Sequence, residues 1–484
     1  VINHAATDNN QITTAVGASV SAGAKSGFSF DGALASSSIK NDTNANIDGA
    51  DIRAGKKVDN AAYDADDLNK SFDKEMAEDG LDPAGLTYRE NAEKNAATKG
   101  EGKVALDTKA KGSTKIITTA LAASANLSSK GVGGAGAAAV SVLQNTMAAR
   151  IEKSAIEANM LNNIASSDAL LINTAGGMAV GGGYFSGAGS VSVQYTSDTT
   201  KAEMEDSDVE AQHTAVQAKT KNVDVNVAGQ VSAGQNGAGL ALAFNHMNNA
   251  TQAHILGSSI KGAAHEVAVA AENSGTTVSA AAGVSGGSTS ALTGALAINQ
   301  GKDTTQAGIG ASESKRSSLE NVNRIAVDAK DSTTKVAVAG GLSAAGTAAV
   351  GGAIAYNQVG GVGYQSTEAF LNNTDILTKG DKSALRVRAL DEATLGTAAA
   401  GIGGAGSVAV QGAAATSNIE KNVRTQMKDT TVKSAAGEKR GSLSLKAESV
   451  GSMYTNTVVL AGSGTAAVGA GVSVTTALGS TRAE

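Results

Sequence analysis

The sequence predicts an all-β fold, a parallel β-solenoid assembled from repeats of about 55 residues. Three observations support this prediction. Three short signatures recur along the chain in a fixed order, their spacing is regular, and the apolar residues inside them alternate with small or polar residues. Alternation with period two is typical of β-strands.

The composition favours an elongated fold with a thin core. The 484 residues include no Cys, no Trp, a single Pro (Pro83) and 59 Gly, and aromatic residues make up 3% of the chain. The apolar fraction of 41% is mostly Ala and Val. Such small side chains fill a narrow core, and a narrow core is extensive only when the fold is long.

The charge balance and the short apolar runs argue against a nucleic-acid-binding protein and against a membrane-spanning protein. With 39 basic and 45 acidic residues the net charge is −6, so the chain lacks the basic surface of a nucleic-acid-binding protein. No apolar run approaches the roughly 20 residues of a membrane-spanning helix, so no transmembrane segment is expected. The chain begins at Val1 without a signal peptide, and we interpret it as a fragment of a longer protein.

The first signature is a run of small residues that ends near an Asn. The copies end at Asn145, Asn245, Asn299 and Asn357, with a weaker copy at Asn418. Because a unit of 55 residues exceeds a solenoid coil of about 20 residues, two to three coils are expected per unit. These Asn residues would then lie in non-adjacent coils, so we expect turn residues rather than a continuous asparagine ladder.

The second signature has the form Ala-x-(Ile/Met)-x-x-(Ser/Thr/Ala)-x-(Ile/Val). Its apolar anchors are Ile47, Ile151, Met204, Ile255, Ile309, Leu371 and Met427. From Ile151 onward the intervals are 53, 51, 54, 62 and 56 residues. The paired positions Ile255 and Ile260 are five residues apart and cannot share one strand face, which predicts a bend between them. A stack of such coils at about 4.8 Å each gives a shaft on the order of 100 Å long.

The third signature is apolar-x-apolar-x-(Ala/Thr). Its copies begin at Val104, Leu170, Val267, Ile325, Leu385 and Leu443. An Ala-rich stretch such as 201–221 also has helix propensity. It aligns with the strand-like stretch 251–269, and equivalent repeats keep one structure, which favours strands throughout.

One repeat is interrupted. The first interval, from Ile47 to Ile151, is 104 residues, nearly two units, and the segment between is rich in Asp and Glu. Leu68, Phe72 and Met76 have helical spacing. The prediction is therefore solenoid over residues 1–54, a helical insertion over 55–102, and solenoid again over 103–484.

No arrangement of residues predicts catalysis, a cofactor or a metal. The five histidines, His4, His213, His246, His254 and His265, form no zinc signature and are expected on loops or outer faces. Runs such as 181–183 lack the Gly-Lys-Ser/Thr ending of a phosphate loop. Asp64, Asp66 and Asp67 resemble the start of a calcium loop but lack its Gly and closing Glu, so a solvated acidic helix is expected.

The block Val350-Gly-Gly-Ala-Ile-Ala-Tyr-Asn357, followed by an Ala-x-Ile-x-x-Ser-x-Ile segment, resembles repeats of very large type V-secreted exoproteins of Gram-negative anaerobes. These include autotransporter adhesins, filamentous-haemagglutinin-like proteins and proteins of the fusobacterial leukotoxin type. The resemblance covers nearly all of the chain outside 55–102. It implies a right-handed parallel β-helix, secretion or display at the cell surface, and contact with host cells or other bacteria through a surface protein or glycan.

The leading functional expectation is a non-enzymatic structural and adhesive shaft, with a segment of a large secreted cytotoxin as the alternative. The insertion contains Tyr63, Phe72 and Tyr88, which are candidate partner contacts, although these rings can equally fasten the insertion to the shaft. A polysaccharide-degrading β-helix enzyme is less favoured because acidic or basic residues do not recur at equivalent coil positions. Open strand edges at the two ends of the chain predict some self-association.

Overall fold

A computed structural model describes residues 2–22, 26–53, 105–379, 383–434 and 441–484, and all regular secondary structure in these ranges is β-strand. The strands are β1 (Ile2–Ser21), β2 (Phe28–Asp48), β3 (Asp51–Arg53), β4 (Ala105–Asn126), β5 (Val132–Glu152), β6 (Ala155–Gly181), β7 (Phe185–Glu205), β8 (Asp208–Leu256) and β9 (Ser259–Gly301). They continue with β10 (Thr304–Gly310), β11 (Ser317–Ala345), β12 (Ala348–Asn372), β13 (Thr374–Thr378), β14 (Ala384–Ala405), β15 (Val408–Lys428), β16 (Thr431–Ser434), β17 (Ser442–Ser463) and β18 (Ala466–Ala483).

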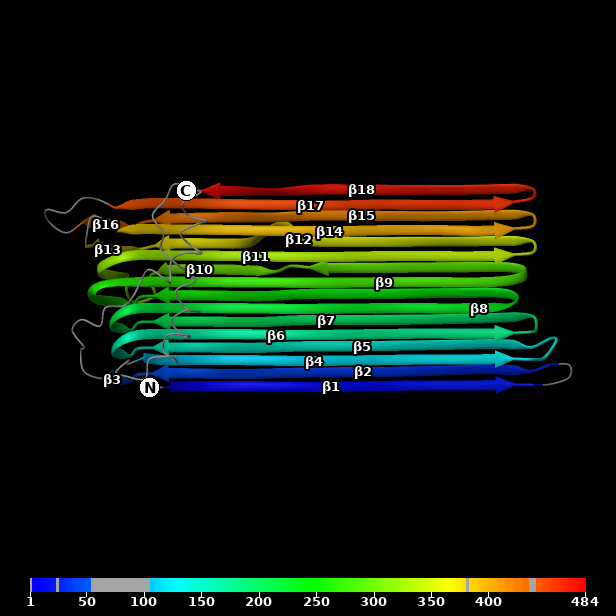
Figure 1. Ribbon diagram of the computed structural model, residues 1–484, viewed down its shortest axis with the longest axis horizontal. Coiled ribbons are helices and arrows are strands. Elements are labelled where there is room, and N and C mark those ends of the chain that lie inside the picture. Colours follow the sequence, from blue (N-terminus) through cyan, green and yellow to red (C-terminus); the bar gives the residue numbers. More distant parts are fainter. Residues whose placement is uncertain (1, 23–25, 54–104, 380–382, 435–440) are drawn as a thin grey trace, which may run out of the picture.

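The strands form a flat parallel β-solenoid of eight stacked coils, each with two long legs (Figure 1). The first legs pair in parallel in the order β1, β4, β6, β8, β9, β11, β14 and β17. The second legs run back in the opposite direction and pair in the order β2, β5, β7, β8, β9, β12, β15 and β18. β8 and β9 each run through both legs of a coil, and β10 completes the second leg that β9 begins. The all-β parallel solenoid expected from the repeats is confirmed, and the helical alternative for the array is wrong.

Each repeat unit is one coil, not the two to three coils expected from its length. The anchor Ile255 pairs directly with Ile309, and Asn299 pairs directly with Asn357, so equivalent residues of successive units lie in adjacent coils. The expectation was wrong because it assumed short strands. With almost no proline to interrupt them, legs of about 20 residues form instead, and two legs with their corners use a whole unit.

The overall proportions therefore differ from the expected long shaft. Eight coils at about 4.8 Å stack to only about 35 Å, whereas a leg of 22 residues such as β4 extends about 70 Å. The long axis of the described structure follows the strands, as Figure 1 shows, and the stacking direction is shorter.

The bend predicted within the second signature is confirmed. Ile255 and Ile260 are both fully buried, and Gly257 between them has a φ of +55°. Equivalent corners use Lys153, Asp206 and Asn373, with φ between 47° and 50°. These left-handed residues turn the chain from the second leg into a short third strand.

A row of hydroxyl side chains holds the corners of successive coils together. Ser207 donates from Oγ to the carbonyl oxygen of Glu205 at 2.8 Å and accepts from the backbone N–H of Ser154 at 3.2 Å. Ser258 repeats the arrangement with the N–H of Ser207. The Ser/Thr position of the second signature is thus explained by the backbone groups that each corner leaves unpaired.

The core changes along the legs. Near the corners it contains large side chains such as Leu161, Met204 and Ile255, which all lie in one buried cluster. Toward the turn between the legs the buried side chains are alanines. At that end a Cβ on Gly177 would lie 2.4 Å from the carbonyl oxygen of Gly189, so the opposing legs approach too closely for a side chain there. The expectation that Gly and Ala line a narrow section is confirmed.

The third signature is in register for Val267, Ile325, Leu385 and Leu443, but their partner in the coil of β6 is Leu161, so the copy assigned to Leu170 is wrong. In β4 the partner of Leu161 is Leu106, so the copy that was assigned to begin at Val104 is displaced by two residues. Leu170 lies nine residues after Leu161 in the chain, and its side chain faces outward.

The predicted helical insertion 55–102 lies outside the described residues. Strands β3 and β4 mark its place, at the corner where the short third strand leads back to the first leg. The right-handed sense stays a prediction.

Candidate interaction surface

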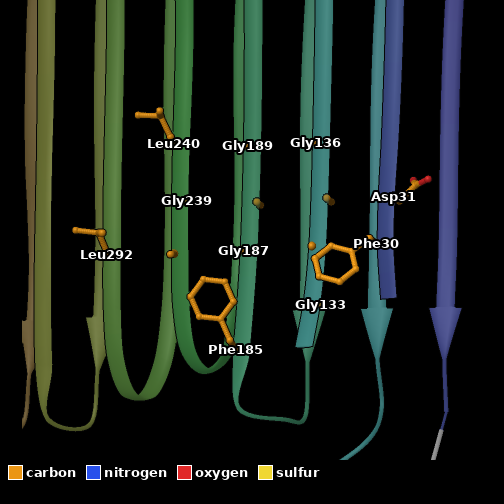
Figure 2. A pocket seen from close by; sticks show the side chains of 14 residues that line it. Phe30, Asp31, Gly133, Gly136, Phe185, Gly187, Gly189, Gly239, Leu240 and Leu292 are labelled. Atoms are coloured by element: carbon orange, nitrogen blue, oxygen red, sulfur yellow. The ribbon is translucent and has the colours of Figure 1, made fainter. Parts of the chain in front are cut away.

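An apolar hollow lies on the outer face of the second legs, close to the turn that joins the two legs (Figure 2). It has a volume of about 500 Å³ and is shallow and widely open to solvent. Its lining residues are Phe30, Asp31, Gly133, Gly134, Ala135, Gly136, Phe185, Gly187, Ala188, Gly189, Ala238, Gly239, Leu240 and Leu292. These residues come from β2, β5, β7, β8 and β9, so the hollow follows the stacking direction across five coils.

Glycine shapes the hollow. Outward-facing Gly136 and Gly189 pair with each other in β5 and β7, and a Cβ at either would meet nothing within 4 Å. The rings and branched side chains around them lie over other glycines, with Phe30 over Gly134. A row of glycines therefore lowers the floor, and large apolar side chains form the rim.

The rim side chains are exposed to solvent. Phe30 is 66% exposed, Leu240 53% and Leu292 54%. In Figure 2 the side chains of Phe30, Phe185, Leu240 and Leu292 project from four different strands along the stack, β2, β7, β8 and β9. Exposed apolar side chains grouped in this way distinguish a contact surface from scattered surface residues.

The apolar character extends over both outer faces next to the turn between the legs, and we call this region the apolar end. On the first legs one outward column contains Met178, Val231, Val284, Leu342, Ile402 and Leu460. On the second legs a column contains Phe30, Leu292, Val350, Val410 and Val468. Residues 225–244, 278–298, 336–355 and 396–416, which surround this turn in four successive coils, contain no Asp, Glu, Lys, Arg or His.

Charges concentrate at the opposite end of the legs. Arg150 lies 3.2 Å from Glu203, Lys219 lies 2.9 Å from Glu272, and Arg388 lies 3.2 Å from Glu448, each pair joining neighbouring coils. Exposed pairs of this kind contribute little to stability, typically about 0–1 kcal/mol each. Their main effect is to keep this end hydrated, in contrast to the apolar end.

A second hollow of about 330 Å³ lies on the short third face. It is lined by Asp51, Arg53, Ala155, Ile156, Glu157, Asp208, Val209, Glu210, Ser259 and Lys261. Asp51 lies 3.6 Å from Arg53, and Asp208 lies 3.0 Å from Lys315. These two carboxylates are therefore balanced by neighbouring cations.

The interior contains a row of ionisable side chains that sequence reasoning missed. Five carboxylates and two amines point inward and are at most 3% exposed, namely Asp198, Asp224, Asp303, Asp331, Asp391, Lys335 and Lys421. Burial raises the pKa of Asp224 to about 7 and the pKa values of Asp198 and Asp303 to about 6. Two hydrogen bonds partly offset this effect and lower the pKa of the carboxylate that accepts them. Thr196 donates to Asp224, and the backbone N–H of Asn249 donates to Asp303.

Two asparagine pairs stack in the interior, contrary to the expectation of isolated turn residues. Asn299 donates from Nδ2 to Oδ1 of Asn357 at 2.9 Å, and Asn41 donates likewise to Asn145 at 2.8 Å. Asn245 pairs in register with Asn299. The expectation was wrong because it followed from two to three coils per unit, whereas one coil per unit places Asn245, Asn299 and Asn357 in adjacent coils. The copies at Asn145 and Asn418 are out of register with these three, since Asn145 aligns with Asn249 and the partner of Asn357 is Ser417.

Tyr63, Phe72 and Tyr88, and the acidic run Asp64, Asp66 and Asp67, lie outside the described residues, so their roles stay predictions. The aromatic residues that the structure brings near the hollow are Phe30 and Phe185. A sequence signal for this surface existed in the segments without charged residues that surround the turn in four successive coils.

Of the histidines, His246 stacks on Tyr195 with ring centroids 5.3 Å apart. His254 is not on a loop but is packed against Phe370 at 5.5 Å, and burial lowers its pKa to about 4. Within the described ranges no group of three His, Cys, Asp or Glu side chains is arranged to bind a metal ion.

Among the described residues no helix is long and apolar enough to cross a membrane. Comparison of the chain with family models, with curated proteins and with solved structures gives no match.

Proposed function

We propose that this chain is a non-enzymatic structural and adhesive segment of a secreted or surface-displayed bacterial protein, and that it binds its partner through the apolar end. The observation that supports this most is the exposure of ordered apolar columns on both outer faces, next to turns that lack charge in four successive coils. A regular parallel stack provides the rigid support that such a surface needs.

The chemistry of the surface favours a protein partner with an apolar face. Phe30, Leu240 and Leu292 present apolar surface and no side-chain hydrogen-bonding groups. The carboxylate in the lining, Asp31, already accepts a hydrogen bond from the backbone N–H of Ala123. A glycan presents hydroxyl groups that need polar partners. Apolar side chains around a hollow instead resemble the centre of a protein–protein interface.

The experiment introduces a charge on this surface and measures binding of the labelled chain to host-cell and bacterial surfaces by flow cytometry. Leu240→Glu and Leu292→Glu should each weaken binding at least about tenfold, because a carboxylate would lose water on contact. Asn248→Glu is the matched control, since Asn248 is exposed on the same face of β8 near the charged end. The control should bind like wild type.

Equal binding by Leu240→Glu and wild type would contradict the proposal. Deletion of residues 56–101 is a separate arm, and loss of binding there alone would assign the contact to the insertion with Tyr63, Phe72 and Tyr88. Killing of leukocytes by the chain in the same assay would favour the cytotoxin alternative.

A further inference from the structure

One buried amine lies between two buried carboxylates. Lys421 of β15 places Nζ 2.5 Å from Oδ1 of Asp391 on β14 and 2.7 Å from Oδ2 of Asp331 on β11. The lysine side chain is 3% exposed and both aspartates are fully buried. Asp331 and Asp391 pair in register on neighbouring first legs, and Lys421 reaches them across the interior from the second leg.

Neighbouring side chains fix the orientation of both carboxylates. Asn273 donates from Nδ2 to Oδ1 of Asp331 at 2.6 Å, so the other oxygen, Oδ2, is directed to the amine. Thr367 donates from Oγ1 to Oδ2 of Asp391 at 2.8 Å, which leaves Oδ1 for the amine. The three groups are therefore held in contact by the fold rather than by chance collision.

The charges of this cluster do not balance. With all three groups ionised, two carboxylates face one ammonium, and none of them is accessible to water. Burial lowers the pKa of Lys421 and the two carboxylates raise it, with a net upward direction, while burial raises the pKa of Asp391. The resting state is an ion pair in which the proton of the ammonium has a ready acceptor 2.5 Å away.

We propose that Lys421 and Asp391 condense to form an intramolecular amide (isopeptide) bond, with Asp331 as the general base. A proton moves from the ammonium of Lys421 to Asp391, which leaves a neutral amine and a carboxylic acid. The nitrogen lone pair attacks Cγ of Asp391. Asp331 accepts the second N–H proton and returns it to the departing hydroxyl group, so that one water molecule leaves.

The step balances without any further reagent. An ammonium and a carboxylate become an amide and water, Asp331 ends as the carboxylate it began as, and nothing is oxidised or reduced. Contact enforced by the fold replaces a bimolecular encounter, and the product removes one positive and one negative charge from a dry interior, where both are costly.

The bond would give the chain a covalent crosslink, although its composition does not allow a disulfide. There is no cysteine for a disulfide. A bond between residues 391 and 421 joins the two legs of one coil and closes a loop that contains the turn between β14 and β15. That coil would resist extension whatever the apolar end binds, so this inference does not depend on the proposed function.

Lys335 provides a matched control within the same interior. It is also fully buried, in a space left open because residue 301 is glycine, where a Cβ would lie 2.4 Å from Nζ. Its Nζ has no hydrogen-bond partner. With no carboxylate in contact, it should not condense.

The test is the intact mass of the purified chain after prolonged incubation in the folded state. Wild type should be lighter than its sequence by the mass of one water molecule. After denaturation and trypsin digestion, residues 389–424 should appear as a single peptide that has lost one water, because a modified Lys421 is not cleaved and no other Lys or Arg lies between residues 389 and 420. Fragmentation should locate the link between Asp391 and Lys421.

Three variants test the roles, with folding checked by circular dichroism. Lys421→Arg and Asp331→Asn should have the full mass of their sequences, whereas Lys335→Arg should still lose water. A wild-type chain of full mass, cleaved normally after Lys421, would overturn the proposal. Loss of water in folded Asp331→Asn would overturn the assignment of Asp331 as the base.

Discussion

At the scale of single residues, the interior is governed by which side chains face one another across the two legs. Lys335 occupies an inward position where the neighbouring coils have Thr277 and Leu395, and it fits because Gly301 on the opposite leg has no side chain. A long polar side chain therefore fits in the core because the residue that faces it on the opposite leg is small. Such pairs connect positions that are distant in sequence.

The buried carboxylates predict a pH dependence of stability. The pKa of Asp224 is about 7 in the folded chain, against 3.8 for an unburied aspartate, so folding takes up protons between these values. The stabilising contribution is fully present below about pH 4 and is lost as the pH rises through 7, by at most roughly 4 kcal/mol for Asp224. Thermal melting should therefore occur at a higher temperature at pH 5 than at pH 8.

Asp224→Asn should raise the melting temperature at pH 8 and reduce the difference between the two pH values, because its side chain has no charge to bury. Asp168→Asn, at an exposed position, is the matched control. A melting temperature of wild type that rises from pH 5 to pH 8, or an unchanged pH difference in Asp224→Asn, would contradict this prediction.

At the scale of strands, the separation of the two legs is set by the inward-facing residues. Alanine clusters and inward glycines bring the legs together near the turn, as where Gly341 and Gly401 face the carbonyl oxygens of Gly352 and Gly412. Isoleucine, leucine and methionine hold the legs apart near the corner. The outline of each coil thus tapers from the corner to the turn.

A pair of glycines tests this account. Gly177→Ala places a Cβ 2.4 Å from the carbonyl oxygen of Gly189, so the legs must separate, which should destabilise the chain by about 1–3 kcal/mol. Gly189→Ala points outward into open space and should be neutral or slightly stabilising. Urea denaturation compares the midpoints, and equal midpoints for the two variants would show that close packing of the legs does not limit stability.

At the scale of the whole molecule, each end of the described stack has two long strand edges, one from each leg. Among the described strands, β1 and β2 pair only with β4 and β5 at one end, and β17 and β18 pair only with β14 and β15 at the other. The side chains of β18 are almost all exposed. Unpaired edges of this length pair readily with other strands. We therefore expect the chain to self-associate as its concentration rises.

Analytical ultracentrifugation should show this association, and an inward-facing charge should reduce it. Thr475→Lys changes a residue of β18 in an inward column, and Thr476→Lys changes its outward neighbour as the control. Association that is independent of concentration, or reduced equally by both variants, would show that contacts other than the strand edge are responsible.

The sequence by itself determined the parallel β-solenoid, the repeat of about 55 residues, the bend in the second signature and the narrow Ala/Gly section. Each of these follows from local periodicity or from residue size. Only the tertiary structure decided that one unit is one coil, because coil length depends on where the strands turn.

The tertiary structure likewise brought Lys421 to Asp331 and Asp391, which are 90 and 30 residues away along the chain. It also aligned the apolar positions around each turn into continuous columns. Register between coils fixes both arrangements, and register is a property of the stacked strands, which the order of residues in any one strand does not reveal.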